Sequence, residues 1–329
     1  MEQQVQEREA EELTLVTRKS CFGLPTACPH SLPVFIYLKL AQIPFRLDFN
    51  SIYPDSDQIP YVESGTYVAY NNENDGVIEC LKNDGIVDLD SDFHSLPDWV
   101  STKAMISSWL SDAIMYELWV GSDGKSAYEI YYSDLSWPIG KALFLKQVYL
   151  VKQRLGITKD NAEQRENKIY KRAKFAYGAL STRLGEQKFL FDDRPSSLDA
   201  TFLGHALITL YALPESSVLR SRLLEYDNIV RYAETLKLEL IESGSSSSGP
   251  HFHSVPSSSA PRKGPSSWKS KPKSKSKREK TEEEKTFKKR AKYFLAAQLV
   301  AVLLFLSVMG GYDSGDVELD EDDEGFAYD

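Results

Sequence analysis

The sequence predicts an α+β fold in which a small half of mixed strands and helices precedes an all-helical half. Period-2 alternation of apolar and polar residues occurs only before residue 90, whereas apolar residues at helical spacing dominate after Leu96. A Ser-, Pro- and Lys-rich stretch then separates this body from one apolar run near the C-terminus. The chain of 329 residues is long enough for two halves and these appendages.

The first half begins with a predicted strand over 13–18. Ser31 is placed to cap a buried helix over 34–40, with Pro33 in the first turn, where the missing N–H costs nothing. Apolar and charged residues alternate over 45–49, which predicts a half-buried strand. The order so far is strand, helix, strand.

A hairpin and a short helix complete this half. Strands are predicted over 61–63 and 66–69, around a tight turn at Ser64-Gly65. Apolar residues over 77–81 indicate a short helix that ends at Gly85. The second unit is therefore strand, strand, helix.

The second half is predicted to contain only helices. Apolar residues at helical spacing mark helices over 106–120, 138–155, 169–184, 200–213 and 229–240. The helix that contains 200–213 is so apolar that it is expected at the centre of this half. We therefore expect five helices, with four of them packed around the one that contains 200–213.

A capping box is predicted at the start of that central helix. The Ser196 hydroxyl would accept the N–H of Asp199, and the Asp199 carboxylate would accept the N–H of Ser196. His205, further along the helix, has no Cys, Asp or second His one turn away. It is therefore expected to be a hydrogen-bonded core histidine, and the body is expected to hold no metal or cofactor.

Cysteine content and the N-terminus limit the cellular compartment. Three cysteines, Cys21, Cys28 and Cys80, are too few for a disulfide framework and indicate a reducing compartment. The extension over 1–12 contains five glutamates, which excludes both a secretory signal and a mitochondrial presequence. Whatever sorts this protein is not expected at the N-terminus.

The apolar run over 293–312 predicts one transmembrane helix. Twenty residues at about 1.5 Å rise span about 30 Å, the thickness of a bilayer core. Only Gln298 and Ser307 are polar within the run, and no charge interrupts it. The anchor positions are Tyr293, Leu299, Val302, Leu306, Met309 and Tyr312.

The charges that flank this run predict its orientation. Residues 262–292 contain 14 Lys and Arg against 4 acidic residues, whereas the tip over 313–329 contains 9 acidic residues and no basic one. The positive-inside rule therefore places the body in the cytosol. A span this close to the C-terminus is a tail anchor. Its modest hydrophobicity and basic flank favour the mitochondrial outer membrane, with the tip in the intermembrane space.

The linker over 243–292 cannot bury enough apolar surface to offset ordering, so its composition predicts disorder. Its lysines, at 269–278, could be read as a nucleic-acid patch. No aromatic interleaving or binding fold accompanies them, so a solvated juxtamembrane run is preferred and no nucleic-acid partner is expected. His251 and His253 have no third ligand nearby and predict no metal site.

The order of elements, with Pro60 directly before the third strand, resembles the thioredoxin-like half of a glutathione transferase. The resemblance implies a cis bond at Pro60, although most X-Pro bonds are trans. The run over 180–199 and Phe22-Gly-Leu-Pro25 are similar to the signature of the metaxins, which share that fold. The resemblance extends over residues 13–241, and the tail anchor with its acidic tip also resembles the metaxin arrangement.

The resemblance implies a non-enzymatic role in mitochondrial protein import. Metaxins associate with the sorting and assembly machinery that inserts β-barrel precursors such as porin. The expected partners are therefore these precursors and the barrel-forming subunit of that machinery. The domains would be an acidic extension (1–12), a thioredoxin-like domain (13–90), a helical domain (91–242), a linker (243–292), an anchor (293–312) and a tip (313–329).

Two alternative functions stay open. Cys28-Pro29-His30-Ser31 resembles the thiol centre of glutaredoxins, and a helix N-terminus would favour its thiolate. The long loop before Cys28 and the absence of a Glu-Ser or Asp-Ser pair in 71–75 argue against such a glutathione-dependent enzyme. A generic membrane tether or adaptor with the same architecture is the other alternative.

Overall fold

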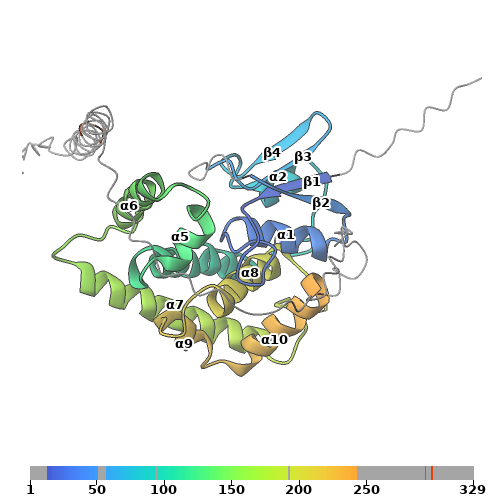
Figure 1. Ribbon diagram of the computed structural model, residues 1–329. Coiled ribbons are helices and arrows are strands. Elements are labelled where there is room, and N and C mark those ends of the chain that lie inside the picture. The colour runs from blue at the N-terminus through green and yellow to red at the C-terminus, as the bar shows by residue number, and fades with distance from the viewer. Residues whose placement is uncertain are drawn as a thin grey trace, which may run out of the picture. The chain divides into compact units, whose positions relative to one another are not determined.

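Four short strands form the sheet of the first half (Figure 1). The computed structural model describes residues 13–50, 57–93, 95–191 and 193–242, together with Tyr293 and Gln298. The strands are β1 (Leu13–Thr17), β2 (Phe45–Phe49), β3 (Tyr61–Ser64) and β4 (Tyr67–Tyr70), in the order β2-β1-β3-β4. Strand β1 pairs in parallel with β2 and antiparallel with β3. The predicted strands are confirmed, and the Ile59–Pro60 bond is cis.

Helix α1 (Ser31–Leu40) is buried on nearly every side, because it lies between the sheet and the central helix of the second half. The prediction that Ser31 caps it is wrong. The helix already includes Ser31, since the carbonyl of Cys28 accepts the N–H groups of Ser31 and Leu32. The buried Ser31 hydroxyl has no hydrogen-bond partner. Helix α2 (Val77–Asn83) follows β4, as predicted.

The second half is helical throughout. Its first helical stretch runs unbroken from Pro97 to Gly121, longer than predicted, and contains two π-helical segments. The elements are α3 (Pro97–Met105), η1 (Ile106–Leu110), α4 (Ser111–Tyr116), η2 (Glu117–Gly121), α5 (Lys125–Tyr131), α6 (Trp137–Arg154), α7 (Ala162–Leu184), α8 (Ser197–Tyr211), α9 (Val218–Leu223), α10 (Asp227–Lys237) and η3 (Leu238–Glu242).

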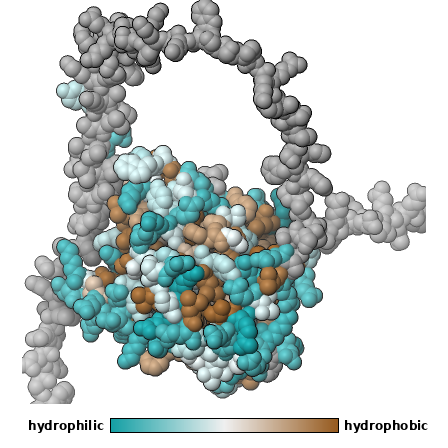
Figure 2. Space-filling model, turned by 60° about the horizontal axis from the view of Figure 1, so that its bottom comes forward, coloured by the Kyte–Doolittle hydropathy of each residue, from teal (hydrophilic) through white to brown (hydrophobic). Residues whose placement is uncertain are grey.

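All five predicted helices are present, but the sequence did not predict α5 or α9. These helices have seven and six residues, too short for a periodic pattern to emerge. Both halves fall within one compact unit, so the division drawn at residues 90 and 91 stays a prediction. On the face shown in Figure 2, a compact group of hydrophobic residues is surrounded by hydrophilic ones.

Helix α8 is the buried axis that both halves share. Thirteen of its fifteen residues are buried. Its contact with α1 is more extensive than the contact between any other two elements. Gly204 permits this approach, because a Cβ atom there would lie 2.9 Å from the Cγ of Pro33. That distance is shorter than carbon atoms tolerate, so the α1–α8 packing requires glycine.

The capping box lies at the N-terminus of α8, with Ser196 in the cap position. The Asp199 N–H donates to the Ser196 hydroxyl at 3.3 Å, and the Ser196 N–H donates to the Asp199 carboxylate at 2.9 Å. The same buried carboxylate accepts the Leu190 N–H at 2.8 Å and the Tyr232 hydroxyl at 3.1 Å. Asp199 therefore joins the start of α8 to the preceding loop and to α10.

We expect Asp199→Ala to destabilise the body far more than a simple cap deletion. Ser196→Ala removes one cap and should cost about 1 kcal/mol. Asp199→Ala removes the acceptor of four buried donor groups and should cost roughly 3 kcal/mol or more. Urea unfolding of residues 1–242 measures both, with Asp160→Ala as the exposed-carboxylate control, expected within about 0.5 kcal/mol of the parent. Equal losses for Asp199→Ala and Asp160→Ala would contradict this role.

Candidate functional site

The thiol of Cys28 is enclosed by the second half. Its side chain is 1% exposed, and its Sγ lies 3.4 Å from the hydroxyl of Tyr131 on α5. The Tyr131 ring packs on Trp119, with ring centroids 5.2 Å apart, and the guanidinium of Arg18 lies 5.6 Å from its centre. Burial and the neighbouring thiol raise the pKa of the Tyr131 hydroxyl, which therefore stays protonated. A nucleophilic thiol needs access, which this arrangement denies.

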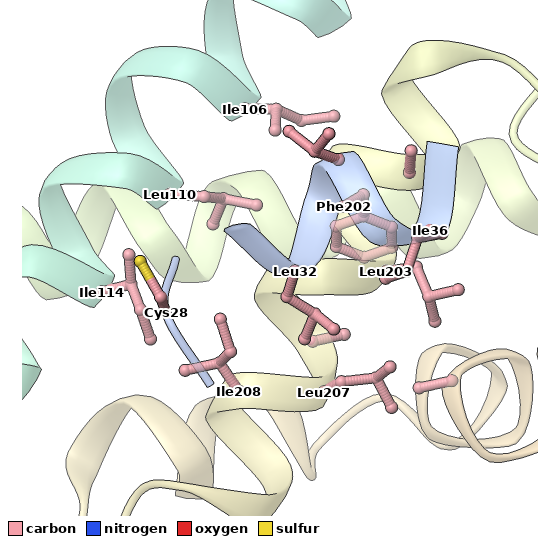
Figure 3. Packing of buried hydrophobic residues seen from close by; sticks show 14 of the residues in the cluster. Cys28, Leu32, Ile36, Ile106, Leu110, Ile114, Phe202, Leu203, Leu207 and Ile208 are labelled. Carbon is pink, nitrogen blue, oxygen red and sulfur yellow. The ribbon is translucent and has the colours of Figure 1, made fainter. Parts of the chain in front are cut away.

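Cys28 belongs to the hydrophobic core that joins the two halves. Figure 3 shows it in the same cluster as Leu32 of α1, Ile114 of α4 and Ile208 of α8. These neighbours are aliphatic and leave the thiol 1% exposed, so a substrate has no access to it. The resemblance of Cys28-Pro-His-Ser to a thiol centre therefore does not extend to its surroundings.

The other two cysteines are no better suited to thiol chemistry. Burial raises the pKa of the Cys21 thiol to about 11 and raises the pKa of Cys80 above its ordinary value. Both therefore stay protonated at neutral pH. Within the described ranges, no group of three or more His, Cys, Asp or Glu side chains could hold a metal ion.

The loop between β4 and α2 is polar but contains no Glu-Ser or Asp-Ser pair of the kind expected at a γ-glutamyl site. Asn74, Asp75 and Gly76 adopt positive φ angles of 45°, 64° and 103°, and α2 then begins with the buried Val77. No side chain caps this helix. The carboxylate of Glu79, in the first turn of this helix, forms ion pairs with Lys82 and Lys103.

A cavity of about 340 Å³ lies between the two halves. Its lining includes Pro33 of α1, Ile78 and Glu79 of α2, and Ile114 of α4, but not Cys28. Two charged groups at its wall pair with each other, since the Lys103 ammonium lies 2.6 Å from the Glu79 carboxylate. The rest of the lining combines apolar side chains with Asp75, His30 and several hydroxyl groups.

Beside this cavity, Asp90 links the halves through a buried ion pair. Its carboxylate is fully buried and lies 2.8 Å from the Lys82 ammonium of α2. It also accepts the N–H of Ser197 at 2.7 Å and the Ser197 hydroxyl at 2.5 Å, at the N-terminus of α8. A carboxylate is stabilised there by the unpaired N–H groups and the helix dipole. Asp90 thus fastens the first half to the axis of the second.

Lys82 connects this pair to Glu79, whose carboxylate lies 2.8 Å from its ammonium. Burial lowers the pKa of Lys82, but the two carboxylates outweigh burial, so the net shift is upward. The indole of Trp99 on α3 lies between two cations, with Lys103 5.2 Å and Lys82 6.0 Å from a ring centre. The network is arranged to hold structure, because its charges neutralise one another.

His205 is the satisfied core histidine that the sequence predicted. Its Nε2 lies 2.7 Å from the hydroxyl of Tyr177 on α7. Burial lowers the pKa of His205 to about 3, so the imidazole is neutral at physiological pH. Because the unfolded imidazole titrates near 6.5, this burial destabilises the fold progressively as pH falls from about 6.5 towards 3. The group serves packing, not proton transfer.

Among the predicted functional residues, Pro60, Ser196 and Asp199 lie in the described body. The extension, linker, tip and nearly all of the predicted anchor, including Leu299, Val302, Leu306, Met309 and Tyr312, lie outside the described residues. Tyr293 and Gln298 are described and are helical. No described helix is both long enough and apolar enough to cross a bilayer.

Sequence reasoning missed the two residues that define this region. Asp90 lies in a polar segment, Asp88-Leu-Asp-Ser-Asp92, where nothing distinguishes the buried carboxylate from its exposed neighbours. Tyr131 belongs to the unpredicted α5, so no pattern indicated that a tyrosine would cover Cys28. Only the tertiary arrangement brings both to the junction.

Comparison with protein families matches both halves of the chain. Residues 29–124 match the glutathione S-transferase N-terminal domain, and residues 173–236 match the glutathione S-transferase C-terminal domain. The fold is therefore glutathione-transferase-like, with a thioredoxin-like sheet and a helical second half.

Three curated relatives of this chain are named metaxins. A protein of Arabidopsis thaliana called mitochondrial outer membrane import complex protein metaxin is 63% identical over 97% of this chain and 99% of its own length. Metaxin-3 of Danio rerio is 27% identical over 69% of this chain and 75% of its own length. Metaxin-1 of Mus musculus is 26% identical over 64% of this chain and 69% of its own length.

Two solved structures with similar chains are glutathione transferases. One from Phanerochaete chrysosporium gives a TM-score of 0.46 at 12% identity, covering 69% of this chain and 96% of that chain. One from Ceriporiopsis subvermispora, solved with glutathione, gives a TM-score of 0.44 at 13% identity, covering 75% of this chain and all of that chain.

Cys28→Ser should leave the protein folded and active in cells, because the thiol touches only core side chains. In the native body, Cys28 should react with a thiol reagent such as dithionitrobenzoate at least about 100-fold more slowly than after unfolding. Glutathione-dependent reduction of a mixed disulfide should be undetectable with or without the substitution. Turnover that the parent shows and Cys28→Ser lacks would restore the enzyme interpretation.

Proposed function

This chain belongs to the metaxin family, and we propose that it acts in protein import at the mitochondrial outer membrane as a non-enzymatic docking component. The observation that supports this most strongly is the near full-length match to the Arabidopsis import complex protein. The match includes the linker and the C-terminal run as well as the body, so the two chains share one overall plan.

The docking component would hold β-barrel precursors such as porin, brace the barrel-forming subunit of the sorting and assembly machinery, or do both. A docking body gains from rigidity, since a surface that is already ordered loses less entropy when a partner binds. The buried Asp90–Lys82 pair and the shared axis α8 support such a rigid body.

The geometry of the body favours docking over thiol transfer. Cys28 is buried against Tyr131, and α2 begins without a polar side chain that could hold a γ-glutamyl group. In the cavity between the halves, the carboxylate of Glu79 is engaged by the ammonium of Lys103, and Cys28 is not part of the lining. Each of these features supports a fold that is used for its surface.

We further propose that the run over 293–312 anchors the chain in the outer membrane, with the body in the cytosol and the tip in the intermembrane space. The basic residues before the run and the nine acids after it support this orientation. A linker with the length and composition of 243–292 has an end-to-end distance of about 35–40 Å. Tethering at this range raises the body's effective concentration at a neighbouring membrane subunit, which supports a role that rests on weak contacts.

Protease added to intact mitochondria should remove the body and leave a small C-terminal fragment. The bilayer and the outer membrane would protect the anchor and tip, while the cytosolic body is accessible. An epitope placed after Asp329 detects the fragment by immunoblotting, and a soluble intermembrane-space protein reports the integrity of the outer membrane. Loss of the fragment under these conditions, or release of the protein by alkaline carbonate, would show that 293–312 does not anchor the chain.

Ending the chain after Glu242 should leave a folded body that no longer accumulates at mitochondria. Cross-linking to arriving porin precursor should then fall at least about tenfold, because the effective concentration provided by tethering is lost. The control restores the anchor by fusing an unrelated outer-membrane tail to residue 242, which should restore cross-linking. If the full chain cross-links to no precursor and to no barrel subunit, the generic tether interpretation is preferred.

A further inference from the structure

Helix α6 exposes an unusual amount of apolar surface. Large hydrophobic side chains that are exposed in the described part of the chain number fifteen, and five of them lie on this one helix. They are Trp137, Ile139, Leu145, Tyr149 and Leu150, with Trp137 76% exposed. A soluble surface helix normally presents charged and polar residues on its outer side. The concentration on α6 therefore needs an explanation other than chance exposure.

Four of the five exposed apolar residues lie on the outer half of the helix, whereas Trp137, in the first turn, lies close to the buried side. Gly140, Phe144 and Val151 are buried against the body. Pro138, Ala142, Leu145 and Tyr149 recur at intervals of 4, 3 and 4 residues, which places them in one row along the outer side. Figure 1 shows α6 at the periphery of the helical half, apart from α8, α9 and α10. The row is thus available to a partner outside the body.

The charge of α6 has one sign. The helix contains Lys141, Lys146, Lys152 and Arg154 and no acidic residue, in a chain with a net charge of −9. Arg154 lies near Asp112 of α4, which it influences electrostatically. An acid-free basic helix with an apolar outer row therefore stands out from the acidic body.

Three carboxylates on and around α5 are paired with cations outside α6. Asp123, before α5, lies 2.7 Å from the ammonium of Lys125. Glu129 and Asp134, on and after α5, lie 3.8 and 2.8 Å from the ammonium of Lys19. These acids are already engaged, so they offset little of the positive charge of α6.

A hollow of about 880 Å³ extends the apolar surface next to the start of α6. Trp137, Phe144 and Lys141 of α6 form one wall, and Tyr128 of α5 and Phe22 contribute to the other. The ammonium of Lys141 lies 5.0 Å from the centre of the Phe144 ring. The hollow thus combines aromatic walls with two cations, Lys125 and Lys141, and two carboxylates, Asp123 and Glu129.

We propose that α6 is a membrane-contact helix, which lays its outer row of apolar residues onto an anionic lipid surface. Interfacial helices combine an apolar face, Trp and Tyr at headgroup depth, and Lys or Arg that extend to lipid phosphates. Helix α6 has all three features. The inference rests on the proposed function only in that the C-terminal anchor keeps the body close to a bilayer.

Charge distinguishes a lipid surface from the other possible occupants. A second copy of the chain would place one acid-free basic helix against another, which repels. A bilayer with anionic headgroups supplies complementary charge along the whole helix, and each basic residue near such a surface strengthens binding about fivefold. The lipid surface therefore fits both the charge and the apolar row.

The test places a photo-cross-linking residue, benzoylphenylalanine, at position 145 of the full chain. The control places it at Val100 on α3, whose side chain is 54% exposed, as is that of Leu145. Both proteins are reconstituted in vesicles of phosphatidylcholine with phosphatidylinositol, or of phosphatidylcholine alone, that contain an alkyne-tagged phospholipid. Carbonate extraction of the same vesicles reports separately whether the C-terminal anchor is inserted.

Lipid adducts at position 145 should exceed those at position 100 at least about tenfold on phosphatidylinositol vesicles. Lys141→Gln with Lys152→Gln should lower the yield at 145 by about 25-fold on these vesicles. The matched pair Lys168→Gln with Lys171→Gln on α7 should leave it unchanged.

Equal lipid adducts at 145 and 100 in a carbonate-resistant chain would overturn the proposal, and the import role would be unaffected. Adducts to polypeptide at position 145 in intact mitochondria, in place of lipid, would also overturn it by showing that α6 is a protein-binding surface. A carbonate-extractable chain that still forms lipid adducts at 145 would support α6 while contradicting the anchor. The experiment therefore distinguishes a wrong proposal for α6 from a wrong proposal for the function of the chain.

Discussion

The carboxylate of Asp90 holds the two halves of the body together, and the positions of α1, α2 and α8 depend on it. It is fully buried, pairs with Lys82 of α2 and accepts two hydrogen bonds at the start of α8. A buried ion pair of this kind adds little net stability over an apolar core, but loss of one partner leaves an uncompensated charge and is strongly destabilising. The Asp90–Lys82 pair therefore serves to fix how the two halves pack against each other. With α8 fixed at its first turn, Gly204 lies against Pro33, and α1 packs along the same axis.

This arrangement explains why a glutathione-transferase-like fold is proposed here as a docking body. Where the halves meet, a transferase would need an accessible nucleophile and polar groups for a peptide ligand. In this chain Tyr131 covers the Cys28 thiol, and Glu79 is bound by Lys82 and Lys103. The carboxylates of Glu79 and Asp90 at the junction are thus bound by groups of the body itself. What the body offers to partners is its outer surface, including the basic and apolar helix α6.

The strongest parts of the fold could be predicted because their signals are local. Alternation over 45–49 indicated β2, a long helical period indicated α7, and Ser196 with Asp199 indicated the box that begins α8. The short helices α5 and α9 could not be predicted, because one or two turns contain too few apolar residues to show a helical period. The residue type of Ser31 predicts a cap, whereas the helix starts earlier because the N–H groups of Ser31 and Leu32 donate to the Cys28 carbonyl. Asp90 and Tyr131 acquire their roles only through residues distant in sequence, which one sequence cannot disclose.

Assembly of radiolabelled porin into mitochondria that lack this protein and any close homologue tests the import role most directly. The account predicts slow formation of protease-resistant, carbonate-resistant porin, while a precursor with a matrix presequence enters at nearly the normal rate. Re-expression of the full chain should restore porin assembly, and the Cys28→Ser chain should restore it equally. Normal porin assembly in the depleted mitochondria would contradict the account.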